Sequence, residues 1–136
     1  MRMSFISLLF LTTLFFPMET NNKGTEVEFY DVIDVVATTY TPSAKETDST
    51  PLVTASGFKI NPKNPKRHRI IAVSRDLKKK YKFGKKVRIT GIGKLSGTYT
   101  IRDVMNKRYK KRVDILIGED DKQTSFKNAK LYAVVK

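Results

Sequence analysis

The stretch TYTIRDVMNKRYKKRVDILI, residues 98–117, contains two runs typical of β-strands that are joined by a cationic loop. Strict alternation in the first run puts Asp103 in a row of otherwise apolar side chains. In the second run Asp114 is flanked by Val113 and Ile115, so it too is expected where water is scarce. Two acids within strand-like segments make this stretch the centre of both the fold and any chemistry.

If the two runs pair as a hairpin, Asp103 falls opposite Asp114, with Cβ atoms about 5 Å apart. Two partly desolvated carboxylates at that separation cannot both ionise easily, so one pKa is expected to rise. A carboxyl group that stays protonated near neutral pH is suited to general-acid chemistry. The alternative is a purely structural role, in which each aspartate pairs with Arg102, Arg112 or a lysine of the loop.

Residues 1–20 resemble an export segment. A short positive start precedes an apolar run over residues 5–16, and Pro17 ends it. The run is shorter than the roughly 20 apolar residues of a membrane span, which favours a secretory signal peptide. No small-residue cleavage site follows, so an uncleaved N-terminal anchor with membrane association through this segment is the alternative.

Export predicts a location in the periplasm or cell envelope, including association with the outer membrane. Residues 21–33 are interpreted as a flexible lead-in, and residues 34–136 as one domain. The chain has no cysteine, so export brings no disulfide bonds.

The chain is strongly basic, with 27 Lys and Arg against 13 Asp and Glu and a net charge of +14. This charge favours an anionic partner. A nucleic-acid-binding barrel has only the charge in its support, because no helical reader or RNA-binding motif is recognisable, so no specific nucleic acid is expected. An exported protein instead meets anionic wall polymers, whose stem peptides carry carboxylates.

Six or seven short strands with turn signals between them indicate a mainly β barrel or sandwich. The predicted strands cover residues 29–41, 52–60, 69–74, 86–90, 98–105, 112–117 and 130–135. Short helices are predicted at residues 75–83 and 119–128.

Histidine and cysteine chemistry is largely excluded. His68 is the only histidine and lies in a basic loop, so metal sites built on several His or Cys ligands are ruled out. A nucleophilic triad has no orienting group for this histidine. No metal or other cofactor is expected, and any catalysis must be carried out by carboxylates.

Several motifs in order resemble the 3D (Asp-Asp-Asp) domain. They are ATTYTP at 37–42, TASG at 54–57, RIIAVS at 69–74, FGKKVRITGIG at 83–93 and VDILIG at 113–118. This domain occurs in stationary-phase survival-type proteins and at the C-terminus of membrane-bound lytic transglycosylase A. The resemblance implies a small six-stranded double-psi β-barrel, related to that of rare lipoprotein A, that acts as a monomer on peptidoglycan.

In this family three aspartates line the groove. The second matches Asp103, and the third, the proposed catalytic acid, matches Asp114. Ser74 stands at the first position, where it is expected to supply a hydrogen bond. Further candidate contacts to the sugar polymer are Tyr40, Thr54 and Ser56.

The resemblance predicts a lytic transglycosylase. Asp114 would protonate the bridging oxygen between N-acetylmuramic acid and N-acetylglucosamine, and Asp103 would hold that proton in place. The sugar's own 6-hydroxyl then attacks, so one acid suffices where an ordinary glycosidase needs two carboxylates. A wall-binding barrel without catalysis is the alternative, favoured by Ser74 and by a basic loop at residues 106–111 where the family has a glycine-rich stretch.

Overall fold

The computed structural model describes residues 24, 26–43 and 51–135. The signal peptide or anchor expected at residues 1–20 lies outside the described residues. Within the described ranges, no helix is long and apolar enough to cross a membrane.

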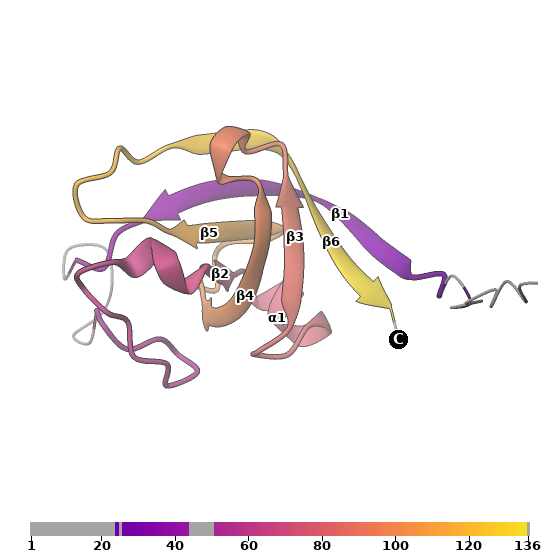
Figure 1. Ribbon diagram of the computed structural model, residues 1–136, viewed down its shortest axis with the longest axis horizontal. Coiled ribbons are helices and arrows are strands. Elements are labelled where there is room, and N and C mark those ends of the chain that lie inside the picture. The colour runs from indigo at the N-terminus through magenta and orange to yellow at the C-terminus, as the bar shows by residue number, and fades with distance from the viewer. Residues whose placement is uncertain (1–23, 25, 44–50, 136) are drawn as a thin grey trace, which may run out of the picture.

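Six strands close into a barrel in the order β1-β5-β2-β4-β3-β6 (Figure 1). In chain order they are β1 Phe29–Tyr40, β2 Ile70–Val73, β3 Lys86–Thr90, β4 Gly97–Val104, β5 Arg112–Leu116 and β6 Ser125–Val135. β1 pairs with β5, and β2 with β4, in parallel, whereas the other four neighbouring pairs are antiparallel. The predicted fold class, a mainly β six-stranded closed barrel of the double-psi kind, is confirmed.

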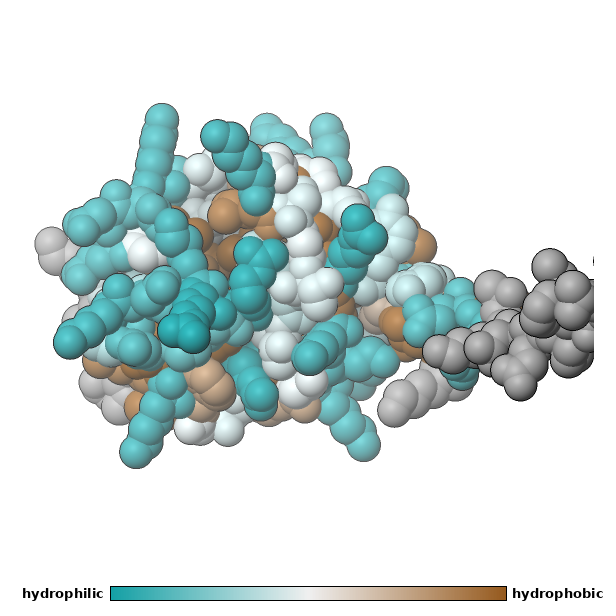
Figure 2. All heavy atoms as spheres, viewed as in Figure 1, coloured by the Kyte–Doolittle hydropathy of each residue, from teal (hydrophilic) through white to brown (hydrophobic). Residues whose placement is uncertain are grey.

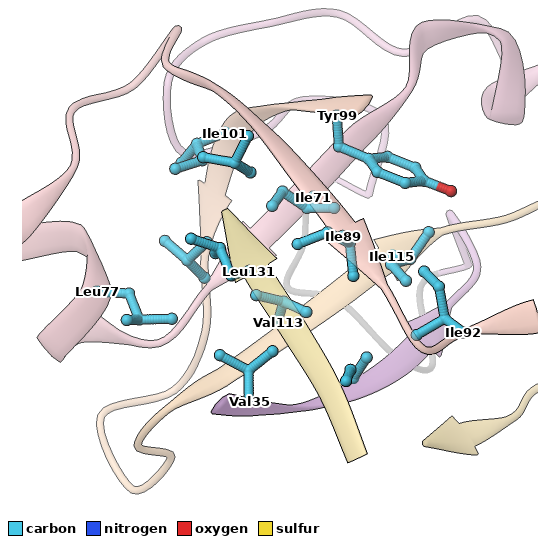
Figure 3. Packing of buried hydrophobic residues seen from close by; sticks show 14 of the residues in the cluster. Val35, Ile71, Leu77, Ile89, Ile92, Tyr99, Ile101, Val113, Ile115 and Leu131 are labelled. Atoms are coloured by element: carbon cyan, nitrogen blue, oxygen red, sulfur yellow. The ribbon is translucent and has the colours of Figure 1, made fainter. Parts of the chain in front are cut away.

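The barrel interior is filled by alternate residues from all six strands (Figure 3). Ile71, Ile101 and Ile115 are almost fully buried there and come from three neighbouring strands. Their β-branched side chains suit the pleated surface of a strand. Leu77 of the helix α1 (Arg75–Lys80) covers one end of this core.

Of the two predicted helices, the first is present and the prediction of the second is wrong. α1 forms within the range predicted at residues 75–83. Residues 119–124 instead form turns before β6, because Asp121 accepts a hydrogen bond from the Gly118 amide at 2.8 Å and Thr39 accepts one from the Thr124 amide at 2.8 Å. Such side-chain acceptors compete with helical hydrogen bonds. Two short 3-10 helices, η2 (Pro65–His68) and η3 (Gly93–Leu95), complete the elements of the described residues.

β4 and β5 do not form the hairpin considered from the sequence. β2 lies between them and pairs with both, in parallel with β4 and antiparallel with β5. Strands adjacent in the chain are often neighbours in a sheet, but a crossover topology separates these two. The prediction that Asp103 lies directly opposite Asp114 in a hairpin is therefore wrong.

A register shift in β4 turns Asp103 out of the barrel. Ile71 pairs with Ile101, whereas the next residue, Ala72, pairs with Asp103. One extra residue in β4 changes the face of every side chain beyond it. The alternation that put Asp103 on the same face as Ile101 is thus interrupted between the two residues.

A second apolar layer covers the outside of the barrel over β1, β5, β2 and β4. It contains the buried residues Tyr40, Ile60, Ile70, Ala72, Met105 and Leu116. Phe58 packs against this layer from the loop of residues 51–60. In that loop the predicted strand is reduced to one antiparallel bridge between Val53 and Lys59, with Gly57 at φ 82° in the turn.

β1 and β6 continue beyond the barrel as a two-stranded ribbon (Figure 1). β5 joins β1 only at Val36, so residues 29–35 of β1 pair with β6 alone. Regular pairing therefore begins at Phe29, inside the range interpreted as a lead-in. Figure 2 shows long hydrophilic side chains projecting from the visible face, with hydrophobic residues between them.

Candidate functional site

Four residues form one row across the outer face of the barrel. Thr38 pairs with Asp114, Asp114 with Ala72, and Ala72 with Asp103. Adjacent strands lie about 4.8 Å apart, so two spacings put the backbones of the aspartates roughly 10 Å apart. The small side chain of Ala72 lies between the two carboxylates.

Both aspartates line a groove of about 1100 Å³ on this face. Its floor comes from the row and from the ends of β1 and β4. One wall is part of the loop at residues 51–55, another is the cationic loop at residues 106–111 with Arg112, and residues 123–125 complete the rim. The concavity needed for a polymer therefore lies beside both predicted acids.

Asp114 is half-buried, and its Oδ1 accepts a hydrogen bond from the Thr38 hydroxyl at 3.0 Å. Val113 and Ile115 on either side of it face the barrel core. The rigid β5 strand thus supports a carboxyl group on its outer face, and one of its oxygens is held by a neighbouring strand. Sequence reasoning selected Asp114 as a candidate acid but did not select Thr38.

Asp103 connects β4 to the loop at residues 51–60. Its Oδ1 accepts hydrogen bonds from the Ala55 amide at 3.0 Å and the Val104 amide at 2.9 Å. The Ser56 amide adds a bond to the Arg102 carbonyl at 3.1 Å. Asp103 therefore shapes the groove wall as well as lining it.

Tyr40 lies in the groove floor with 7% of its surface exposed. Burial raises the pKa of its hydroxyl, and the nearby charges of Asp103 and Asp114 raise it further. The hydroxyl therefore remains protonated over the physiological pH range, and it is buried without a hydrogen-bond partner among the described residues.

Ser74 does not line the groove. It is fully buried, and its hydroxyl accepts a hydrogen bond from the Arg112 amide at 3.0 Å. Its carbonyl accepts the Lys78 amide at 3.0 Å in the first turn of α1. The structure thus gives Ser74 a structural role behind the groove, at the start of the strand that carries Asp114.

Thr54 and Ser56 are bonded to each other, with 3.0 Å between their hydroxyl oxygens. Thr54 lines the groove but is buried, and its hydroxyl also accepts the Phe58 amide at 3.1 Å. Ser56 is not among the groove residues. The pair stabilises the turn of the wall, so only Thr54 reaches the groove.

Sequence reasoning did not place Arg75, Arg108 and Arg112 in the groove, and it considered Arg112 only as a structural partner of the aspartates. Arg108 and Arg112 both pack over the ring of Tyr109, which also lines the groove. The signal was the cationic loop, but the sequence did not reveal which of its residues face the aspartates.

Among the residues that the structure describes, no three His, Cys, Asp or Glu side chains are grouped closely enough to hold a metal ion. His68 accepts the Asn61 amide at 2.9 Å and packs edge-on against Phe58. These contacts give the histidine a structural role in its loop.

Comparisons with models of protein families, with curated proteins and with solved structures found no match to this chain. Two carboxylates and three guanidinium groups on one open groove suit a polyhydroxylated substrate that bears negative charge.

Proposed function

We propose that this protein cleaves the glycan strand of peptidoglycan as a lytic transglycosylase of the 3D-domain type, with Asp114 as the acid. The observation that carries the proposal is that Asp114 and Asp103 lie in one register row and line the same groove. Export through residues 1–20, as a cleaved signal peptide or a retained anchor, is part of the proposal.

The proposed reaction needs only one of the two acids. The backbones of Asp103 and Asp114 lie roughly 10 Å apart across the row. An ordinary glycosidase uses a pair of carboxyl groups, about 5 Å apart in retaining enzymes and about 6.5–9.5 Å apart in inverting ones. A sugar 6-hydroxyl that attacks within its own ring needs no second carboxylate to activate water.

In this mechanism Asp114 donates its proton to the bridging glycosidic oxygen and later receives the proton of the attacking 6-hydroxyl. The bond between the sugar carbon and the bridging oxygen breaks, and the bond to the 6-oxygen forms. Thr38 orients the carboxyl group of Asp114, and Tyr40 forms part of the groove floor with its hydroxyl buried. Asp103 holds the loop wall in place and supplies negative charge near the developing oxocarbenium ion.

A non-catalytic peptidoglycan-binding barrel is the second candidate, and the position of Ser74 favours it. Ser74 is buried behind the groove, so only two of the three positions matched to the family's aspartates line it. Such a protein would use the same groove and the same arginines to hold the polymer.

Digestion of purified sacculi separates these two functions. Wild-type protein is expected to release 1,6-anhydro muropeptides, detected by mass spectrometry. Asp114→Asn is expected to lower the rate of release by roughly 100- to 10,000-fold, the usual contribution of a general acid. Sacculus binding should be retained, because asparagine has nearly the same shape as aspartate.

Thr90→Ser, on β3 and away from the groove, is the matched control and is expected to keep full activity. Undiminished product release by Asp114→Asn would remove the acid assignment. Sacculus binding without any product from the wild-type protein would favour the binding barrel.

A further inference from the structure

Among the residues that the structure describes, three arginines line the groove and have no acidic partner. The ion pairs within the described part of the chain join Lys66 with Asp121, Lys80 with Asp31 and Lys130 with Asp34. None involves Arg75, Arg108 or Arg112, although all three line the groove that contains Asp103 and Asp114. Their positive charge is therefore available to a ligand.

Tyr109 orients two of these guanidinium groups. The Cζ atoms of Arg108 and Arg112 lie 4.7 and 4.6 Å from the centre of its ring. Arg108 also donates a hydrogen bond from Nη2 to the Tyr109 hydroxyl at 2.6 Å. Stacking restricts the rotamers of both arginines, which lowers the entropy cost of binding a ligand. Nε of Arg112 is buried and has no hydrogen-bond partner among the described residues.

The loop that carries these side chains is fixed at both ends. Asn106 accepts hydrogen bonds from the Arg108 amide through Oδ1 and from the Tyr109 amide through its carbonyl, each at 3.1 Å. At the other end the Lys111 amide donates to Oδ2 of Asp76 at 2.9 Å. The loop thus holds Arg108 in a defined position before any ligand arrives.

We propose that Arg108 and Arg112 bind a carboxylate on the peptide side chain of the glycan strand, with Arg75 adding charge at the groove rim. Arg112 lies two residues before Asp114 on the same face of β5, which is about 7 Å along the strand. A carboxylate held there fixes which glycosidic oxygen meets Asp114. This inference rests on the proposed function and assigns its specificity determinants.

Carboxylate fits this site because it is planar and matches the guanidinium fork with two parallel hydrogen bonds. Phosphate is the other oxyanion that arginine binds in this way, so a phosphate polymer is the main competitor. Neutralising the carboxylates of the ligand distinguishes the two possibilities, because it would weaken binding to a carboxylate site and would not affect binding of a phosphate polymer.

The test measures binding by full-length protein that carries Asp114→Asn, so that turnover does not consume the ligand. Titration calorimetry would compare a soluble disaccharide-peptide fragment with the same fragment after amidation of its carboxylates. Arg108→Gln/Arg112→Gln removes two charges from the groove, and Lys86→Gln/Lys94→Gln removes two from exposed positions elsewhere. A short single-stranded DNA serves as the phosphate polymer.

The arginine double variant is expected to bind the native fragment at least about 10-fold more weakly, the usual scale for hydrogen bonds to charged groups. Amidation should weaken binding by the parent protein to the same extent and should not weaken the double variant further. The lysine double variant should bind as the parent does. Arg108 is exposed, so Arg108→Gln alone should lose several-fold in affinity without disturbing the fold.

Equal losses in the arginine and lysine double variants would overturn the proposal, because they would indicate non-specific charge attraction. Unchanged affinity for the amidated fragment would also overturn it. DNA binding as tight as that of the fragment, with the same dependence on the arginines, would assign the site to phosphate instead. All of these outcomes are independent of cleavage, so they are separate from failure of the proposed enzyme activity.

Discussion

The two faces of β5 and β2 differ in their surroundings, because one faces the barrel core and the other faces the groove. Val113 and Ile115 of β5 and Ile71 of β2 point into a sealed apolar core. Asp114, one residue from each of its β5 neighbours, faces the groove. Alternation along a strand therefore separates residues that stabilise the fold from residues that face the groove, so substitutions on the two faces should affect different measurements.

The largest effect on stability is expected from Ile71→Ala on the inner face. Ile71 is fully buried between two strands, and truncating such a side chain typically costs about 2–5 kcal/mol of unfolding free energy. Urea denaturation measures the loss. The affinity of the folded fraction for sacculi should not change. A large change in that affinity would contradict the prediction that core substitutions affect only stability.

A smaller loss of stability is expected from Ser74→Ala. The Arg112 amide would lose its buried acceptor, at a cost of about 1–3 kcal/mol. Denaturant unfolding measures this cost, and Ser74→Thr, which keeps the hydroxyl, is the matched control. A loss of sacculus affinity in Ser74→Ala with unchanged stability would instead assign Ser74 to the groove.

The smallest effect is expected from Asp76 of α1, which lies on neither face of β5 and β2, and it is a dependence of stability on pH. Burial opposes ionisation, but hydrogen bonds from the Ser74 hydroxyl and the Lys111 amide outweigh it and lower the pKa of Asp76. Because the pKa is lower in the folded state, this stabilisation is complete above the unfolded value of about 3.9 and disappears as pH falls through the folded value.

Asp76→Asn should therefore be less stable than wild type at pH 7, by less than about 1 kcal/mol because the group is partly exposed. The difference should shrink toward pH 2, as measured by denaturant unfolding across that range. A difference that stays constant with pH would show that the charge of Asp76 is not responsible.

The strands were predictable because their signals are local. β3 has the bounds predicted from the alternation in residues 86–90, and β1 follows a β-branched and aromatic run. The assignment of residues 119–128 to a helix failed because acceptors elsewhere in the fold, such as Thr39, bond that segment. Long-range partners of this kind have no signature in a short sequence window.

The candidate site was predictable in composition but not in arrangement. Asp103 and Asp114 do share a groove, yet the sequence indicated direct opposition and a common face with Ile101. One inserted residue in β4 and the crossover that brings β2 between the strands decide both points. Neither a bulge nor a strand order is encoded in hydrophobic alternation. The same limit hid Arg75, which reaches the groove from α1.

The hydrogen bond from the Ala55 amide to Asp103 links one wall of the groove to its floor. A ligand that takes over this carboxylate oxygen must displace the amide, so occupancy and opening of the 51–60 loop become thermodynamically linked. Faster hydrogen exchange at the Ala55 amide on ligand binding would therefore report engagement of Asp103 directly. Exchange of this one backbone proton would therefore show whether the ligand contacts Asp103.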